Sequence, residues 1–228
     1  MKKITIPYKP RDLQKEIHSG MKRFNVLVCH RRFGKTVLTV NELIKKCLQN
    51  QLPRPRYYYI APTYSMAKRI AWDYLKYYTS VLPNMEYHET ELRADLPNGG
   101  RIQLLGCERP NTLKGLYIDG VILDEVAQMP PKIWTEVIRP ALSDREGWMI
   151  AIGTPTGHSH LRDSFSKCDT IVMATTEPRI ALTLNKDEHK VLMLAAVKYN
   201  LSKSRVVAFI VRDWIHENRK QLEKKEKR

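Results

Sequence analysis

The sequence predicts an α/β protein, in which a mainly parallel sheet flanked by helices is followed by a small strand-helix-helix segment. Within residues 1–168, short apolar runs alternate with stretches of helical periodicity, as in a parallel sheet with crossover helices. The apolar runs lack the polar alternation of half-exposed strands, so we expect both faces of the sheet to be covered. Residues 179–228 follow a different pattern, with one short strand and then two amphipathic helical stretches.

Each element of the first region is predicted from its own stretch of sequence. Strands are expected at the apolar runs Asn25–Cys29, Tyr57–Ala61, Arg101–Leu105, Val121–Leu123 and Met149–Ile152. Helices are expected at Lys35–Leu48 and Tyr64–Thr79, where apolar residues recur at helical spacing. We place a junction at 169–178, which divides the chain into domains 1–168 and 179–228.

The composition favours a polyanionic partner and argues against several other classes of protein. The net charge is +15, from 39 Lys and Arg against 24 Asp and Glu, and nucleic acid is the commonest partner for such a charge. No apolar run reaches the roughly 18 residues of a membrane span, and the N-terminus lacks the apolar segment of a secretory signal. The scattered cysteines argue against a zinc site and a disulfide scaffold, so a cytoplasmic protein with reduced thiols is expected.

A phosphate-binding loop is predicted directly after the first strand. Residues 29–36 (CHRRFGKT) end in the Gly-Lys-Thr of the P-loop pattern, although Cys29 stands where the first glycine usually lies. Backbone N–H groups of the helix that starts at Gly34 would face phosphate oxygens. Lys35 would reach the β- and γ-phosphates, and Thr36 would hold Mg²⁺. A basic surface turn is the alternative interpretation.

Two adjacent acids, Asp124 and Glu125, end the apolar strand Val121–Leu123. In P-loop NTPases the first such acid assists Mg²⁺, and the next can activate the attacking water as a general base. A solvated strand end is the alternative, but buried carboxylates are costly unless a metal ion or cations offset their charge. Thr154 follows the strand Met149–Ile152 and so falls at the same sheet edge, where its hydroxyl could sense the γ-phosphate.

The ordered series of motifs resembles the ATPase part of large terminase subunits, the DNA-packaging motors of tailed bacteriophages. The series includes a motif of the kind that recognises adenine, an arginine-rich Walker A motif, a Walker B region and a coupling motif. It covers about residues 6–166. In chain order the matching segments are Tyr8–Gln14, His30–Thr36, Ala61–Tyr64, Ile70–Trp72, Leu113–Leu116, Asp119–Ala127, Trp134, Pro140–Leu142 and Gly153–Gly157. The resemblance implies a P-loop fold of the ASCE/RecA-like type.

The resemblance also implies how the chain would bind ATP and Mg²⁺. Gly34, Lys35 and Thr36 would contact the phosphates, and Thr36 would also hold the metal. Asp124 would support Mg²⁺ and Glu125 would activate the water that attacks the γ-phosphate. In this interpretation the two cofactors of the reaction are held by the Walker A and Walker B segments.

Four further residues take roles from the same resemblance. Gln14 would contact adenine, and Thr154 would link hydrolysis to DNA movement. Arg31 or Arg32 would stabilise charge on the transferring phosphoryl group, as arginine fingers do. The alternative for both arginines is surface charge unrelated to phosphate.

Residues Arg179–Ile215 resemble a ribbon-helix-helix DNA-binding module. In that family two chains pair their strands into a ribbon that enters the major groove. Strand alternation assigns the groove face to Arg179, Ala181 and Thr183, and the turn before the second helix assigns a phosphate contact to Ser202, Lys203 and Ser204. A helical hairpin packed on the ATPase domain is the alternative.

The leading hypothesis is a large-terminase-like ATPase for viral DNA packaging, which binds Mg-ATP and double-stranded DNA as a homo-oligomer in the cytoplasm of the bacterial host. The resemblance implies a small terminase subunit, a portal and a separate nuclease as further partners. We expect no nuclease activity of its own, because few residues follow Cys168 and they offer no carboxylate triad. The alternative is a non-catalytic DNA-binding regulator, a ribbon-helix-helix dimer that carries an ATPase remnant. A helicase shares the glutamine, P-loop and Asp-Glu elements. A translocating helicase, however, needs a second RecA-like domain, for which we expect no room in this chain.

Overall fold

The computed structural model describes residues 4–29, 31–154, 170–174, 181–184, 190–195, 206–207 and 210. Only the backbone is described for 170–174 and 181–184. Contacts divide the chain into two compact units, Met1–Thr183 and Leu184–Arg228.

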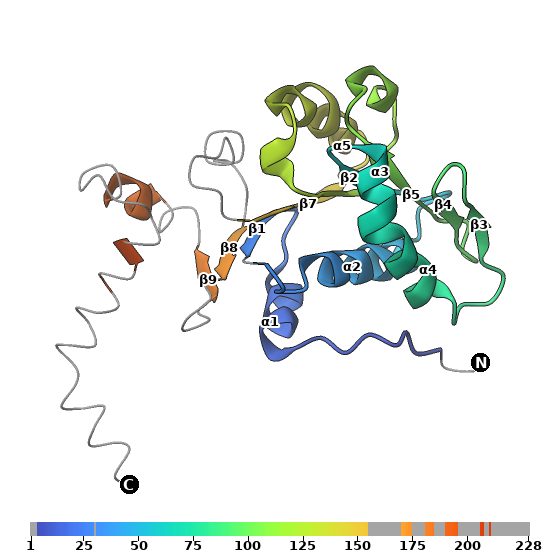
Figure 1. Cartoon of the computed structure of the whole chain (residues 1–228), viewed down its shortest axis with the longest axis horizontal. Helices are drawn as coiled ribbons and strands as arrows, with labels where there is room; N and C mark the ends of the chain where they lie inside the picture. Colours follow the sequence, from blue (N-terminus) through green and yellow to red (C-terminus); the bar gives the residue numbers. More distant parts are fainter. Residues whose placement is uncertain are drawn as a thin grey trace, which may run out of the picture. The chain divides into compact units, whose positions relative to one another are not determined.

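A nine-stranded sheet forms the centre of the first unit, in the order β3-β4-β5-β2-β6-β7-β1-β8-β9 (Figure 1). Its strands are β1 (Phe24–Cys29), β2 (Arg56–Ala61), β3 (Glu86–His88), β4 (Arg93–Asp95), β5 (Arg101–Gly106), β6 (Gly120–Leu123), β7 (Trp148–Gly153), β8 (Thr170–Ala174) and β9 (Ala181–Leu184). Strands β5, β2, β6, β7, β1 and β8 run parallel, whereas β3 and β4 add antiparallel to the β5 edge. The expected mainly parallel sheet is confirmed, and every strand expected before residue 168 lies within an observed one.

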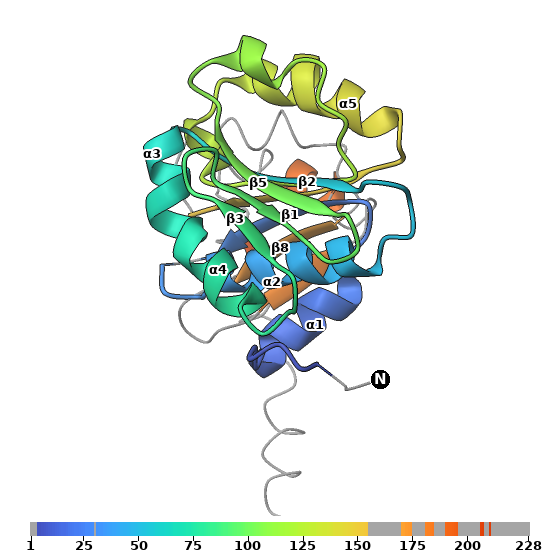
Figure 2. The ribbon, with the colours of Figure 1, turned by 90° about the vertical axis from the view of Figure 1, so that its right-hand side faces the viewer.

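Helices cover both faces of this sheet (Figure 2). One face carries α1 (Asp12–Gly20), α2 (Lys35–Gln49), α3 (Tyr64–Ala67), the π-helical segment η1 (Lys68–Trp72) and α4 (Asp73–Thr79). The other carries the 3₁₀ turns η2 (Pro110–Leu113) and η3 (Val126–Gln128), the π-helical segment η4 (Ile133–Ile138) and α5 (Arg139–Ser143). Helix α2 ends one residue beyond the predicted Lys35–Leu48, and the predicted helix Tyr64–Thr79 is one continuous helical stretch whose middle widens into η1.

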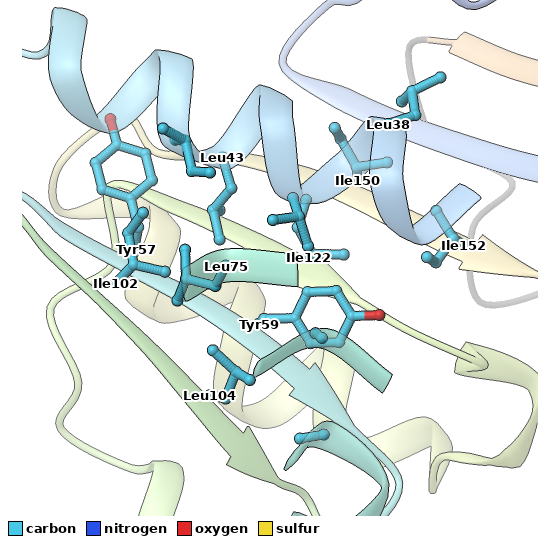
Figure 3. Packing of buried hydrophobic residues seen from close by; sticks show 14 of the residues in the cluster. Leu38, Leu43, Tyr57, Tyr59, Leu75, Ile102, Leu104, Ile122, Ile150 and Ile152 are labelled. Atoms are coloured by element: carbon cyan, nitrogen blue, oxygen red, sulfur yellow. The ribbon is translucent and has the colours of Figure 1, made fainter. Parts of the chain in front are cut away.

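The core consists of two apolar layers, because successive residues of each strand point to opposite faces. Leu27, Tyr59, Ile122 and Ile150 belong to the layer under α1, α2 and α4. Val26, Ile60, Val121 and Met149 belong to the layer under η4 and α5. Figure 3 shows Leu38 and Leu43 of α2 directed at the first of these layers. Burial on both faces explains why the central strands have nearly continuous apolar sequences.

The polar side chain of Asp119 fixes the start of β6. It is 4% exposed, and it accepts hydrogen bonds from the backbone N–H of Arg56 at 2.6 Å and from Nε of Arg145 at 2.8 Å. A buried carboxylate with these partners holds β6 against the start of β2. Asp119 belongs to the Walker B-like segment, but its role is structural. It lies at the start of β6, whereas Asp124 follows the end of the same strand.

The sheet continues further along the chain than the predicted division at 169–178. Strand β8 lies inside that predicted junction and pairs in parallel with β1, with Asn25 opposite Thr170. Strand β9 is the outer neighbour of β8. The segment assigned to a ribbon with a second chain thus contributes its strand to this sheet, because an edge next to β8 is available for pairing within the chain.

The second unit contains helical segments at 190–195, 206–207 and 210. Leu192 and Val206 are buried against each other, with Ala195 and Val207 beside them. These helical residues lie on both sides of the expected turn, which is outside the described residues, and the strand-helix-helix order stays a prediction. The predicted DNA contacts Arg179, Ser202, Lys203 and Ser204 lie outside the described residues, and no side chain is described for Ala181 and Thr183.

The described cysteines are buried thiols. Cys29, Cys47 and Cys107 form no disulfide with one another. Burial raises the pKa of Cys47 to about 12 and that of Cys107 to about 11, so both thiols stay protonated near neutral pH. Among the residues that the structure describes, no helix is both long enough and apolar enough to cross a membrane.

Replacing Leu43 by alanine tests the contribution of α2 to the core. Leu43 is 1% exposed, and loss of its buried carbons leaves a cavity under the helix. The free energy of unfolding should fall by about 2–5 kcal/mol, measured by urea denaturation with tryptophan fluorescence. Leu52→Ala is the control, because Leu52 is 48% exposed and its truncation should cost about 0.5 kcal/mol or less. Equal losses for the two variants would contradict the packing described above.

Candidate nucleotide-binding site

Three loops meet at the carboxyl edge of the parallel strands. Strand β7 lies between β6 and β1, and all three run in the same direction. The loop after β1 contains the Gly-Lys-Thr sequence, Asp124 and Glu125 follow β6, and Thr154 follows β7. This edge is where ligands bind in open α/β sheets. The site residues predicted from these three loops are therefore brought together.

Hydrogen bonds join the loops through Lys35. Its Nζ donates to the carbonyl oxygen of Cys29 at 2.8 Å and to Oγ1 of Thr154 at 3.3 Å. The hydroxyl of Thr154 in turn donates to Oε1 of Glu125 at 3.2 Å. A lysine, a hydroxyl and a carboxylate from three separate loops thus form one chain of contacts.

The start of α2 is shaped to receive an anion. Gly34 is the residue before the helix and has φ +88°, in the left-handed region that glycine adopts without strain. No side chain among the described residues caps this helix start, and the first N–H groups of a helix have no partner within the helix itself. Helix N-termini with this geometry bind phosphate through the backbone N–H groups and the helix dipole.

The predicted adenine contact, Gln14, lies against the phosphate-binding loop. It is 4% exposed, and its Nε2 makes long hydrogen bonds to the carbonyl oxygens of Phe33, at 3.4 Å, and Gly34, at 3.5 Å. Its Oε1 accepts from the backbone N–H of Arg11 at 3.0 Å. A Cβ added to Gly34 would lie 3.0 Å from Nε2 of Gln14. Gln14 therefore supports the loop, and its contact with adenine stays a prediction.

Asp124 is a buried carboxylate with a pKa above its ordinary value. The side chain is 4% exposed, and burial is the main cause of the raised pKa. The negative charge of Glu125 raises the pKa further, while a hydrogen bond from Tyr59 and the charge of Lys35 oppose the shift. The Tyr59 hydroxyl donates to Oδ2 of Asp124 at 2.6 Å. A nearby cation would favour the ionised form of this acid.

Glu125 has a strained backbone. Its φ of +46° and ψ of +45° lie in the left-handed region, which is costly for a residue with a β-carbon. Arg32 in the phosphate-binding loop also has a positive φ, +65°. Such outliers occur preferentially at functional sites, where the surrounding structure holds them.

The oxygen donors at this edge fit a magnesium ion. Mg²⁺ prefers hard oxygen ligands and is held in nucleotide sites by one or two protein groups together with phosphates. Thr36 offers a hydroxyl and Asp124 a carboxylate, and the carboxylate is hydrogen-bonded to the phenol of Tyr59. The sequence analysis predicted only a strand at Tyr57–Ala61, so the polar contact of Tyr59 was missed.

The two arginine candidates occupy the same loop. Arg31 and Arg32 are both exposed, next to the glycine-lysine-threonine turn. Their position allows contact with a bound phosphate, and a contribution to catalysis remains a prediction for either residue.

A second cluster of ligand-type side chains lies away from this edge. Glu86, His88 and Asp95 on the β3–β4 hairpin bring their ligand atoms within 4.8 Å of one another. The carboxylate of Asp95, however, is paired with Nε of Arg101 at 2.6 Å and Nε of Arg93 at 3.1 Å. Two guanidinium groups already compensate its charge, so this cluster is a network of salt bridges.

The sequence also missed a buried network that fixes α1. Nδ1 of His18 lies 2.6 Å from Oε2 of Glu42 on α2, and Nε2 lies 3.0 Å from the hydroxyl of Tyr8. Glu42 is 1% exposed, and Lys45 is 3.6 Å from the same carboxylate oxygen. Since Gln14 and His18 are one turn apart on α1, this network also places Gln14. Helical spacing alone gave no signal for a pairing between α1 and α2.

A loop with a lysine at a helix start, beside two acids at a strand end, defines a P-loop nucleoside triphosphatase. Residues 28–168, more than half of the chain, match the family described as "Terminase large subunit, T4likevirus-type, N-terminal". The chain belongs to this family, which confirms the resemblance seen in the ordered motifs. The ribbon-helix-helix part of the prediction stays untested.

Relatives with the same description cover the same region. The large terminase subunits of Thermus phage G20c and Thermus virus P23-45 are each 30% identical in an alignment of 169 residues, and the match covers 66% of this chain and 34% of theirs. The chain thus spans about a third of the length of these relatives. The solved ATPase domain of the Thermus phage P74-26 large terminase is 28% identical, with a TM-score of 0.61 and 71% of each chain covered.

A more distant structure shows the same fold. The large terminase of bacteriophage HK97 is 18% identical, with a TM-score of 0.54, over 65% of this chain and 33% of that one. The predicted P-loop architecture of the ASCE/RecA-like type is confirmed by these similarities.

The pH dependence of stability should reveal the charge on Glu42. Although burial would raise the pKa of Glu42, the hydrogen bond from His18 and the charge of Lys45 lower it below the ordinary 4.5. The ionised carboxylate therefore contributes stability above about pH 4.5, and this contribution is lost as the pH falls through the lower folded-state pKa. The difference in unfolding free energy between wild type and Glu42→Gln should shrink from about pH 6 to about pH 3.

Urea denaturation at a series of pH values measures this difference. Glu16→Gln is the control, because Glu16 is an exposed glutamate on the same helix as His18. Its difference from wild type should stay near zero throughout. A Glu42→Gln difference that does not change with pH would disprove the ionised state of Glu42.

Proposed function

We propose that this chain binds ATP with Mg²⁺ and hydrolyses it as the ATPase part of a large terminase that packages viral DNA. The observation that carries the proposal is the contact chain from Lys35 through Thr154 to Glu125. It joins a phosphate-binding group to a carboxylate able to activate water. Family membership and the similarity to the P74-26 ATPase domain support the same conclusion.

In the proposed reaction, water attacks the γ-phosphate and ADP leaves. The N–H groups at the start of α2 and the ammonium of Lys35 bind the phosphate oxygens and stabilise the charge that develops there. Thr36 and Asp124 would hold Mg²⁺, which supplies further positive charge at the β- and γ-phosphates. Glu125 orients the attacking water and accepts its proton.

Thr154 is proposed as the group that senses the γ-phosphate. Its hydroxyl contacts both Lys35 and Glu125, so a phosphate that draws Lys35 toward itself would also change the partners of Glu125. This gives a physical basis for coupling hydrolysis to DNA movement. Arg31 or Arg32 would add positive charge at the transferring phosphoryl group, and Gln14 would contact adenine.

The proposed macromolecular partner is double-stranded DNA. The net charge of +15 attracts a polyanion, and the related chains are large terminase subunits. The proposal includes a homo-oligomeric motor in the host cytoplasm that acts with a small terminase subunit, a portal and a nuclease. The tail residues Arg179, Ala181, Thr183, Ser202, Lys203 and Ser204 remain proposed DNA contacts.

Glu125→Gln tests the proposed chemistry. The amide keeps the shape of the side chain but cannot accept the proton from water, so steady-state ATP hydrolysis should fall by about 10²- to 10⁴-fold. Binding of ATP, measured by fluorescence with a labelled analogue, should change little. The assays are run with and without double-stranded DNA, and DNA should stimulate the wild-type rate.

Glu136→Gln is the matched control, because Glu136 is an exposed glutamate on the other face of the sheet. It should hydrolyse ATP at the wild-type rate. Unchanged turnover in Glu125→Gln would remove Glu125 from the mechanism, and a wild-type chain that binds ATP without turnover would favour the non-catalytic alternative.

A further inference from the structure

The phenol of Tyr59 contacts Asp124, one of the two residues proposed to hold Mg²⁺. The Tyr59 side chain is fully buried on β2, and its hydroxyl donates to Oδ2 of Asp124 at 2.6 Å. Burial raises the pKa of this phenol, and the side chain of Thr36 lies near it and lowers its pKa. The hydroxyl therefore contacts the acid after β6 and lies close to the first turn of α2.

The sheet fixes the position of this phenol. Tyr59 pairs with Ile122 across β2 and β6, and the backbone N–H of Asp124 donates to the carbonyl oxygen of Ile60 at 2.8 Å. The ring packs in the apolar layer beneath α2, near Leu104 and Ile122 (Figure 3). A rigid ring on a central strand leaves the hydroxyl little freedom. It therefore sets the orientation of the Asp124 carboxylate before a ligand is bound.

We infer that Tyr59 is a positioning residue for the metal, and that it orients the Asp124 carboxylate to bind Mg²⁺ together with ATP. This inference rests on the proposed function. Asp124 is 4% exposed, so water offers little replacement for the lost donor if the phenol is removed. Groups that orient metal ligands in this way commonly change metal affinity by about 10- to 100-fold when they are replaced.

Tyr57 provides a matched control on the same strand. It is 3% exposed and belongs to the same apolar layer as Tyr59. Its hydroxyl donates to the carbonyl oxygen of Lys46 at 3.1 Å and accepts from Asn50 at 3.0 Å. Tyr57→Phe thus removes a buried phenol hydroxyl, as Tyr59→Phe does, but one that contacts the end of α2. Both substitutions keep the ring and its packing.

The experiment measures metal and nucleotide binding separately in the full chain. Binding of Mn²⁺, a paramagnetic substitute for Mg²⁺ at oxygen ligands, is followed by electron paramagnetic resonance in the presence of ATP. Binding of ATP alone is measured in EDTA. In Tyr59→Phe the dissociation constant for Mn²⁺ should rise about 10- to 100-fold. Affinity for metal-free ATP should stay within about twofold, and Tyr57→Phe should match wild type in both assays.

Three results would overturn the inference. These are an unchanged Mn²⁺ affinity in Tyr59→Phe, an equal loss in Tyr57→Phe, or a parallel loss of metal-free ATP binding in Tyr59→Phe. The first would mean that Asp124 is oriented without the phenol, and the others would mean a general role in folding. A wild-type chain that binds neither ATP nor Mn²⁺ would instead refute the proposed function itself.

Discussion

The parallel register of β6, β7 and β1 is the constraint on which the nucleotide site depends. Leu123 is opposite Ala151 and Val28 is opposite Gly153, so the three strands end nearly level. Their following loops therefore emerge at one edge, within reach of a single lysine side chain. A slip of one residue would turn every buried side chain of a strand to the wrong layer, so the two-sided core enforces this register. The apolar packing and the polar site are thus specified by the same alignment.

Two buried carboxylates in the first unit show opposite pKa shifts, and the difference fits a structural role for one acid and the proposed metal-binding role for the other. Glu42 is held ionised by His18 and Lys45, so its charge is compensated within the chain. Asp124 has a neutral phenol and a second acid as close neighbours, and burial raises its pKa. An acid whose charge is left largely uncompensated in a site of this kind is suited to bind a cation. Glu42 instead fixes α1 against α2 and thereby the residues that support the phosphate-binding loop.

Much of this arrangement could be predicted from the sequence, because strand ends and turn residues carry local signals. Strands β1, β2, β5, β6 and β7, helix α2 and the edge that gathers Lys35, Asp124, Glu125 and Thr154 all followed from apolar runs and their flanking residues. The β3–β4 hairpin was missed, because its three-residue strands are too short for a periodicity to show. The contacts of Tyr59 and His18 were missed for a different reason. They join residues distant in sequence, and only the packing of β2 on β6 and of α1 on α2 creates them. The extension of the sheet through β8 likewise depends on the free edge of β1, which composition does not reveal.

The left-handed backbone at Glu125 has a consequence for engineering this fold. Glycine adopts that conformation without strain, so a substitution there could raise the thermal resistance of the fold while removing the carboxylate. A search for heat-tolerant variants that scores folding alone would therefore select glycine at Glu125, the position proposed to activate water. In the proposed mechanism, stabilisation and turnover would compete at this residue, so a selection for robust variants should include ATP hydrolysis as a second criterion.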